Sequence, residues 1–408
     1  MAVFVTDGEQ RATLAVVRAL GREGIQATVG SQSRTSLAGS SRYCARSVAY
    51  PSPENEPEEF QAFLRREVQE RQYKVLLPMT DVTLQLLSKA RAALTPFVTL
   101  PIPEESSVRG VLDKAQILIK ARELGIPCPR TFSVEGEESL EELSRRVLYP
   151  AVIKPRFSRY CRDGRWFSGG VEYARDAADL IAKYRAVDGQ IPVPLIQEKV
   201  EGEGRGVFLL IWGGELKAAF CHRRLREKPP WGGVSVYSES VPLEQDLVQQ
   251  SFSLLRASGW QGVAMVEYKR DERDGLCKLM EVNGRFWGSL QLAIDAGMNF
   301  PLMLYRLAAG DDVTPQFSYK VGVRSRWLLG DLDHLWIRLA DSRSANGLSG
   351  RVPSRFRACM NFLKFYERGL HYEVQRIDDP RPAWFEFKSY LADGLGRVMG
   401  RGETTHAA

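Results

Sequence analysis

The chain has 408 residues, a formal net charge of +6, 44% hydrophobic and 26% charged residues, a composition that excludes a disordered, collagen-like or disulfide-scaffold protein. No apolar run of ~18 residues is present, which excludes a spanning helix, and the first residues lack the pattern of a signal peptide. Six cysteines without a CxxC pair predict free thiols, and only four histidines argue against a zinc site, so a metal would sit on carboxylates.

Residues 1–105 alternate between strand and helix patterns. Apolar strand-like runs at residues 2–6, 25–29 and 74–78 alternate with helical spacing at residues 11–20, 58–70 and 81–93. This alternation predicts a parallel sheet with helical crossovers. The glycine-rich dinucleotide fingerprint is absent after the first strand, so the segment is not an obvious nucleotide-cofactor domain.

The central part of the chain changes from helix to strand. Residues 106–145 have helical patterns with a break at Gly125–Thr131, where Pro127 and Pro129 prevent continuation. From residue 149 the pattern is strand-rich, with a helix around 251–258 and a hairpin made by residues 262–271 and 277–283. Residues 286–309 return to helix.

The two strands of this hairpin carry the most informative polar side chains. Alternate residues of a strand share a face, so Glu281, Asn283 and Arg285 point the same way and Glu267 on the neighbouring strand can meet them. Two carboxylates and an amide oxygen are ligands suited to Mg²⁺ held against phosphates, and an arginine can stabilise a transferring phosphoryl group. The alternative is an exposed polar hairpin face.

Two lysines precede this hairpin. Lys154 ends an apolar strand beside the loop 156–170, which is rich in Gly and Arg and could fold over phosphates through its N–H groups. Taken alone, Lys154 is better explained as a surface lysine before a loop, and Lys114 even more so, because lysines on helix faces are common. A further strand ends at Gln197 and Glu198, where backbone groups could pair with the edge of adenine. The glycines at 202, 204 and 206 predict a flexible turn after it.

In this order, over residues 106–310, these features resemble the ATP-grasp superfamily, and most closely its carboxylate–amine ligase and carbamoyl-phosphate-synthase-like branch, in which DK…GIPxPRT, KP, QExxxGEG and ExNxRFWGS occur together. The resemblance implies an α/β fold, α+β in its central part. It would comprise a Rossmann-like pre-ATP-grasp domain (1–105), a two-lobed ATP-grasp domain (106–312, with a small mobile lobe at about 145–200) and a mostly helical C-terminal extension (313–408).

The resemblance also implies a nucleotide site. Lys114 and Lys154 would contact the ATP phosphates. The loop at Ser168, Gly169 and Gly170 would close over them. Adenine would be held by Gln197, Glu198 and Val200, the last two largely through backbone groups, and the ribose would be reached by Glu203.

The metal and the reaction follow from the same resemblance. Glu267, Glu281 and Asn283 would bind one or two Mg²⁺, for which Mn²⁺ could substitute, and Arg285 would stabilise the transferred phosphate. The implied reaction is attack of a substrate carboxylate on the γ-phosphate, followed by displacement of phosphate from the acyl phosphate by an amine. An ATP-dependent phosphotransferase without ligation and a non-catalytic ATP-binding regulatory protein are the alternatives.

The basic segment His222–Ser235 adds candidates for substrate binding. Arg224 and Lys228 are expected to act on an anionic substrate or on the acyl phosphate, whereas the alternative is a solvated basic hairpin. Cys221 and His222 are neighbours on a strand, so their side chains face opposite ways and a structural role is expected. No Ser-His-Asp or Cys-His arrangement is recognisable.

Partners are expected to be small-molecule carboxylates and amines, with a homodimer as a family-level expectation, a cytoplasmic location and no nucleic acid. Residues 356–370 have apolar and basic residues at helical spacing. We expect this helix to pack on the body or in a dimer interface. Peripheral contact with an anionic membrane surface is the alternative.

Overall fold

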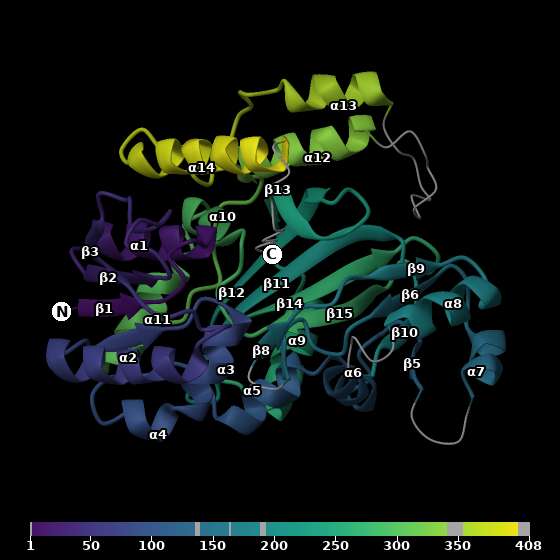
Figure 1. The fold of residues 1–408 in the computed structure, drawn as a ribbon, viewed down its shortest axis with the longest axis horizontal. Helices are drawn as coiled ribbons and strands as arrows, with labels where there is room; N and C mark the ends of the chain where they lie inside the picture. The colour runs from purple at the N-terminus through teal and green to yellow at the C-terminus, as the bar shows by residue number, and fades with distance from the viewer. Residues whose placement is uncertain (1, 135–138, 163–164, 188–192, 341–353, 399–408) are drawn as a thin grey trace.

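The computed structural model describes residues 2–134, 139–162, 165–187, 193–340 and 354–398 (Figure 1). Within these residues the strands form four sheets, and helices pack on the larger ones. The mixed α/β fold class predicted from the sequence is confirmed. No helix among the described residues is long and apolar enough to cross a membrane.

The N-terminal sheet is parallel and has the order β3-β2-β1-β4. Its elements are β1 (Ala2–Val5), α1 (Arg11–Arg22), β2 (Gln26–Ser31), β3 (Cys44–Ala49), α2 (Pro57–Arg71), β4 (Val75–Leu77), α3 (Asp81–Lys89) and α4 (Arg91–Leu94). The strand–helix alternation of the sequence therefore gives the expected parallel crossovers. Strand β3 was not predicted. It forms one edge of the sheet and is only half-buried, so its sequence has no apolar run.

Two helices, α5 (Glu105–Leu112) and α6 (Lys114–Glu123), lead to a smaller antiparallel sheet of order β5-β10-β6-β9. Its elements are β5 (Thr131–Ser133), α7 (Leu140–Arg146), β6 (Ala151–Lys154), β9 (Glu172–Ala174), α8 (Ala177–Val187) and β10 (Leu195–Glu198). This lobe has its own apolar core around Ile153 and Ile196. A short hairpin of β7 (Tyr160–Arg162) and β8 (Arg165–Phe167) extends from it.

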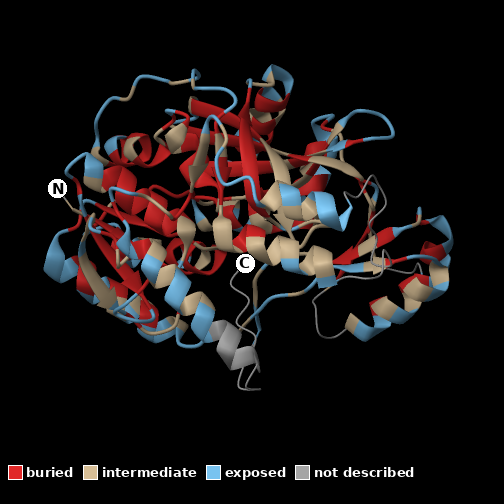
Figure 2. Ribbon diagram, turned by 90° about the horizontal axis from the view of Figure 1, so that it is seen from above, coloured by how far each residue is buried: buried red, intermediate tan, exposed pale blue. Residues whose placement is uncertain are grey.

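The large sheet has the order β15-β14-β11-β12-β13-β16-β17. Its first five strands are β11 (Gly202–Trp212), β12 (Glu215–Lys228), β13 (Val234–Val241), β14 (Gly262–Asp271) and β15 (Cys277–Asn283), and its helices are α9 (Gln245–Ala257), α10 (Leu290–Asp295) and α11 (Phe300–Ala309). Much of this sheet is buried, and these parts are red in Figure 2. Phe208 and Leu210 of β11 face one core, whereas Val207 and Leu209 face the other, which explains its continuous apolar run.

The C-terminal segment is mostly helical, as predicted, with α12 (Leu328–Ala340), α13 (Arg355–Phe362) and α14 (Arg381–Val398) at the top of Figure 1, where α13 lies against α12. It also contributes β16 (Arg324–Arg326) and β17 (Leu370–Tyr372), which complete the large sheet as a parallel pair. Strands of three residues are too short to show a periodicity in the sequence, so only the tertiary structure reveals them.

Candidate functional site

The hairpin of β14 and β15 brings the two glutamates together. Glu267 lies directly opposite Glu281, and Met265 lies opposite Asn283. Opposite residues of an antiparallel pair have their side chains on the same face. Glu267, Glu281 and Asn283 therefore lie on one face of the large sheet, as the alternation of the sequence predicts.

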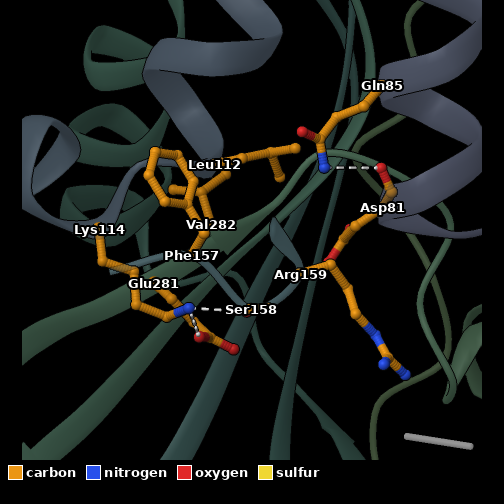
Figure 3. A pocket seen from close by; sticks show the side chains of 9 residues that line it. All are labelled: Asp81, Gln85, Leu112, Lys114, Phe157, Ser158, Arg159, Glu281 and Val282. Carbon is orange, nitrogen blue, oxygen red and sulfur yellow. Dashed lines mark hydrogen bonds and ion pairs between the residues drawn. The ribbon is translucent and has the colours of Figure 1, made fainter. Parts of the chain in front are cut away.

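Lys114 reaches this hairpin from the first turn of α6. The carboxylate of Asp113 caps this helix by accepting from the N–H groups of Ala115 and Gln116, which fixes Lys114 at the helix start. The Lys114 Nζ lies 3.6 Å from a carboxylate oxygen of Glu281 and donates to the Ser158 hydroxyl at 2.6 Å. Figure 3 shows these three side chains converging.

Lys154 ends β6 and is buried beside the same group of charges. Burial, reinforced by the positive charge of Lys114, lowers the pKa of Lys154 to about 8. Glu281 and Glu267 oppose this shift. The structure therefore brings together the two lysines and two glutamates predicted for the nucleotide and metal site.

The two glutamates differ in their electrostatics. Burial raises the pKa of Glu267, although Arg224 opposes the shift. Burial acts in the same direction on Glu281, but Lys114 and Lys154 outweigh it and lower the pKa of this carboxyl. The two lysines thus keep Glu281 in its ionised form. An ionised carboxylate is suited to bind a metal cation that also contacts a polyphosphate.

Arg224 reaches the site across a neighbouring strand. It lies on β12, yet its guanidinium Nη1 is 2.7 Å from Glu267 on β14, with β11 between them, and it pairs with the carboxylate through both Nη atoms. A second carboxylate, that of Glu227, accepts from the same guanidinium at 2.9 Å. The expected proximity of Arg224 to the metal-binding residues is therefore present in the structure.

The glycines of β11 explain how this crossing is possible, and the expectation of a flexible turn at 202–206 is wrong. These residues form the start of β11, where Gly206 pairs with Glu267. A Cβ at Gly204 would lie 3.0 Å from Cδ of Arg224, and one at Gly206 would lie 2.6 Å from the His222 ring. Because Gly204 and Gly206 have no side chains, this face of β11 leaves room for the Arg224 side chain to cross the strand.

The oxygen ligands fit Mg²⁺. Among the described residues no group of three or more His, Cys, Asp or Glu side chains could hold a metal ion by itself. Mg²⁺ is usually held by one or two carboxylates together with substrate phosphates and water. Glu267, Glu281 and the amide of Asn283 supply such a partial set, beside lysines that would contact the phosphates.

Arg285, just after β15, faces the N-terminal sheet. Its Nε donates to the carboxylate of Asp81 at 3.0 Å, at the start of α3. Asp81 also lines a small pocket with Gln85, Lys114, the loop residues 157–159 and Glu281 (Figure 3). The pocket thus lies between the N-terminal domain, the loop after β6 and the predicted metal ligands.

The residues predicted to hold adenine lie at the end of β10 and just after it. The Gln197 amide donates to the Thr131 hydroxyl at 2.7 Å. Glu198 uses its own N–H to bond the Arg130 carbonyl, and its carboxylate accepts from the Arg130 N–H. The backbone N–H and the carboxylate of Glu198 are thus both engaged within the protein. Val200 is buried.

Three other predictions are not joined to this group by any contact described here. Glu203 pairs with Arg205 at 2.6 Å, and the register of β11 puts it on the opposite face from Gly206 and Glu267. Lys228 pairs with Asp333 of α12 at 2.5 Å. The residues Ser168, Gly169 and Gly170 follow β8, with Ser168 and Gly170 exposed. Residues 163–164 of the same loop lie outside the described residues.

His222 has the structural role predicted for it. It is buried, with its ring edge-on to Phe208 at a centroid distance of 4.6 Å. Burial lowers the pKa of His222 well below its ordinary range, so the ring is neutral. Cys221 is buried in the core on the other face.

The sequence analysis missed three partners of the site residues: Ser158, which contacts Lys114; Asp81, which contacts Arg285; and Glu227, which contacts Arg224. Ser158 lies in the loop that the sequence singled out, but nothing marked its hydroxyl. Asp81 had one usable signal, because it opens a helix at the carboxyl end of a parallel strand, where ligands of α/β proteins gather. Glu227 had none, since its neighbours come from a bulged part of β12.

Comparison with known proteins agrees with this geometry. Residues 190–329 match the model of a family described as "ATP-grasp in the biosynthetic pathway with Ter operon". This range contains β10 to β16, and hence Glu267, Glu281, Asn283 and Arg224. A comparison with curated protein sequences gives no match.

Solved structures share the fold at low sequence identity. An L-amino acid ligase from Bacillus licheniformis has a TM-score of 0.59 at 18% identity, covering 76% of this chain and 75% of its own. The biotin carboxylase from Campylobacter jejuni has a TM-score of 0.63 at 12% identity, covering 79% and 74%. The N5-carboxyaminoimidazole synthetase from Staphylococcus aureus, complexed with ADP, has a TM-score of 0.60 at 11% identity, covering 79% of this chain and 80% of its own. The resemblance to the ATP-grasp superfamily is thus confirmed.

Proposed function

We propose that this ATP-grasp protein is an ATP-dependent ligase that converts a substrate carboxylate into an acyl phosphate, couples it to an amine and releases ADP and phosphate. The observation that carries the proposal is the convergence of Lys114, Lys154, Glu267 and Glu281, from three separate parts of the fold. The fold neighbours include a ligase of amino acids and a synthetase solved with ADP, which supports the same class of reaction.

The residues have distinct roles in this proposal. Lys114 and Lys154 neutralise the phosphates of ATP, and Glu267, Glu281 and Asn283 hold Mg²⁺, which would supply charge neutralisation at the γ-phosphate. Phosphoryl transfer depends on positioning and on neutralising charge rather than on a protein nucleophile. This requirement agrees with the buried, neutral His222.

We further propose that Arg224 and Arg285 act on the substrate side. Arg224 is paired with Glu267, so its guanidinium lies beside the proposed metal ligands, where it would meet the transferred phosphate or the acyl phosphate. Arg285, bonded to Asp81 at the pocket between the domains, would stabilise the transferred phosphate, as the resemblance implies. The charge of an arginine persists at all working pH values, which suits an anion that forms transiently.

Phosphate release tests this function. Purified protein with Mg²⁺ and ATP would be assayed against pooled carboxylates and amines, with Glu281→Gln as the test variant and the exposed Glu70→Gln as its matched control. We expect phosphate release that needs one carboxylate and one amine, is lost by at least about a hundredfold in Glu281→Gln, and is unchanged in Glu70→Gln.

The products separate the alternatives. Hydroxylamine should trap the activated carboxylate as a hydroxamate, as an acyl phosphate requires. A stable phosphorylated product without hydroxamate would indicate a phosphotransferase, and release of AMP would contradict the proposal. ATP binding without turnover on any pool, unchanged in Glu281→Gln, would favour a regulatory ATP-binding protein.

A further inference from the structure

Two C-terminal helices carry an exposed row of large apolar side chains. On α13 the residues lie at i, i+4 and i+7, and on α14 at i, i+3 and i+7, so each set shares one helix face. We call these six residues the outer apolar face: Phe356, Met360, Leu363, Trp384, Phe387 and Leu391. They are between 45% and 76% exposed.

This face does not pack on the body of the protein. Helix α13 has no buried residue. Figure 1 places α12, α13 and α14 as an outer layer, and Figure 2, which looks onto this layer, shows it mostly in tan and pale blue. Within the segment 356–370, α13 contacts α12, and its side of Ala358, Cys359 and Phe362 is half-buried. The outer apolar face is left uncovered, and packing in a dimer interface stays a prediction. Large apolar side chains gathered on one surface indicate an interaction site.

The exposed charges beside the outer apolar face are positive. Exposed basic residues on and around α13 and α14 are Arg355, Arg357, Lys364, Arg368, Arg381 and Lys388. Two acidic side chains of this region, Glu367 after α13 and Glu386 on α14, have partners within the protein. Glu367 pairs with Arg324 and accepts from the Tyr237 hydroxyl, and Glu386 accepts from the Trp327 indole at 2.7 Å.

We propose that the outer apolar face binds the surface of an anionic lipid bilayer. Aromatic and aliphatic side chains flanked by Lys and Arg are the pattern of helices that lie in a membrane interface, where the rings enter the acyl boundary and the cations meet anionic headgroups. A second copy of the chain, related by a two-fold axis, would bring these cations against each other. A nucleic acid would leave the six apolar side chains without partners. The proposal does not depend on the ligase activity.

Vesicle flotation of the full chain tests the proposal. We expect the protein to float with phosphatidylcholine vesicles that contain phosphatidylglycerol, and to bind vesicles of phosphatidylcholine alone at least about tenfold more weakly. Raising the salt concentration should weaken the first interaction, because exposed charges are screened. Absence of flotation with both kinds of vesicle would overturn the proposal.

Two pairs of variants separate the apolar and the electrostatic parts. Phe356→Ser with Leu363→Ser, and Arg357→Glu with Lys364→Glu, should each reduce binding at least about tenfold. All four side chains are exposed, so the fold should persist, which circular dichroism and ATP binding would verify.

Matched controls lie elsewhere on the surface. Leu276→Ser removes a 50% exposed leucine from the turn between β14 and β15, and Arg65→Glu with Lys89→Glu makes the same change of net charge on α2 and α3. Both controls should float like the unchanged protein. Equal losses in test and control variants would overturn the proposal. So would a dimer, seen by sedimentation equilibrium, that Phe356→Ser with Leu363→Ser dissolves.

Discussion

At the scale of single residues, Lys154 links burial to nucleotide binding. Its ammonium group is buried next to Lys114, and these two effects lower its pKa to about 8. A polyphosphate bound beside Lys154 would favour the charged form and raise the pKa again. Binding of ATP should therefore be coupled to uptake of a proton at this side chain.

We expect roughly half a proton to be taken up per ATP bound near pH 8, and ATP affinity to fall as the pH rises above that value. Titration calorimetry in two buffers of different ionisation enthalpy measures this uptake. Lys154→Arg should remove the uptake, because arginine stays protonated, and the exposed Lys89→Arg should leave it unchanged. Affinity that is independent of pH between about 7 and 9 would contradict the assignment.

At Gly206 the backbone of β11 packs directly against the rings of His222 and Phe208, leaving no room for a side chain. A Cβ there would lie 2.6 Å from the His222 ring and 2.8 Å from the ring of Phe208, both of which are buried. Gly206→Ala should lower the free energy of unfolding by about 1–3 kcal/mol, as overpacking does. Gly110→Ala on α5, where the Cβ would meet only Gln116 Oε1 at 3.8 Å, should be neutral or stabilise by up to ~1 kcal/mol. Urea unfolding would compare the two.

At the scale of elements, α1 is bound to the segment before α14 by a fully buried ion pair. Arg18 and Asp379 are 0% exposed, with Nε 2.8 Å from a carboxylate oxygen. The guanidinium also donates to the carbonyls of Glu373, Val374 and Asp379. This pair joins the first helix of the chain to its C-terminal segment, which the sequence does not indicate.

Asp379→Asn should therefore cost about 3–5 kcal/mol of stability, because it leaves the guanidinium of Arg18 buried without its counter-charge. The neighbouring pair of Arg22 and Asp378 provides a control, since its side chains are 35% and 45% exposed. Asp378→Asn should cost less than about 1 kcal/mol. Similar losses in both variants, measured by denaturant unfolding, would show that burial of the pair is not decisive.

At the scale of the whole molecule, Glu373 makes stability depend on pH. This carboxyl lies between α1 and the end of the large sheet, and burial raises its pKa to about 7 despite its ion pair with Arg11. Between the ordinary value and about 7, the folded protein keeps a proton that the unfolded chain has released. The free energy of unfolding therefore falls as the pH rises through this window.

We expect this group to lower stability by up to about 3 kcal/mol between pH ~4.5 and ~7. Glu373→Gln should remove the loss, so the difference in Tm between the variant and the unchanged protein should increase with pH. The exposed Glu70→Gln should show a constant difference. Half-buried Glu386, whose pKa burial also raises, contributes in the same direction and remains in both variants. A difference for Glu373→Gln that does not change with pH would contradict this role.

The sequence by itself determined the elements that have a local pattern. The parallel N-terminal sheet follows from alternating strand and helix periodicities, and the pairing of Glu267 with Glu281 follows from two alternating strands joined by a polar turn. The order of Lys114, Lys154 and the hairpin carboxylates predicted a resemblance to the ATP-grasp superfamily, which the family match over residues 190–329 supports and with which the shared fold agrees. In each case the information lies within one element or in the order of elements along the chain.

Only the tertiary structure decided which distant groups meet. The reach of Arg224 over Gly204 and Gly206 depends on three strands in register, and the bond of Arg285 to Asp81 joins residues about 200 positions apart. The exposure of α13 is likewise invisible in its amphipathic pattern, because an apolar face has the same sequence whether it is buried or faces solvent. Pairing, burial and exposure are properties of the assembled chain, and local periodicity does not contain them.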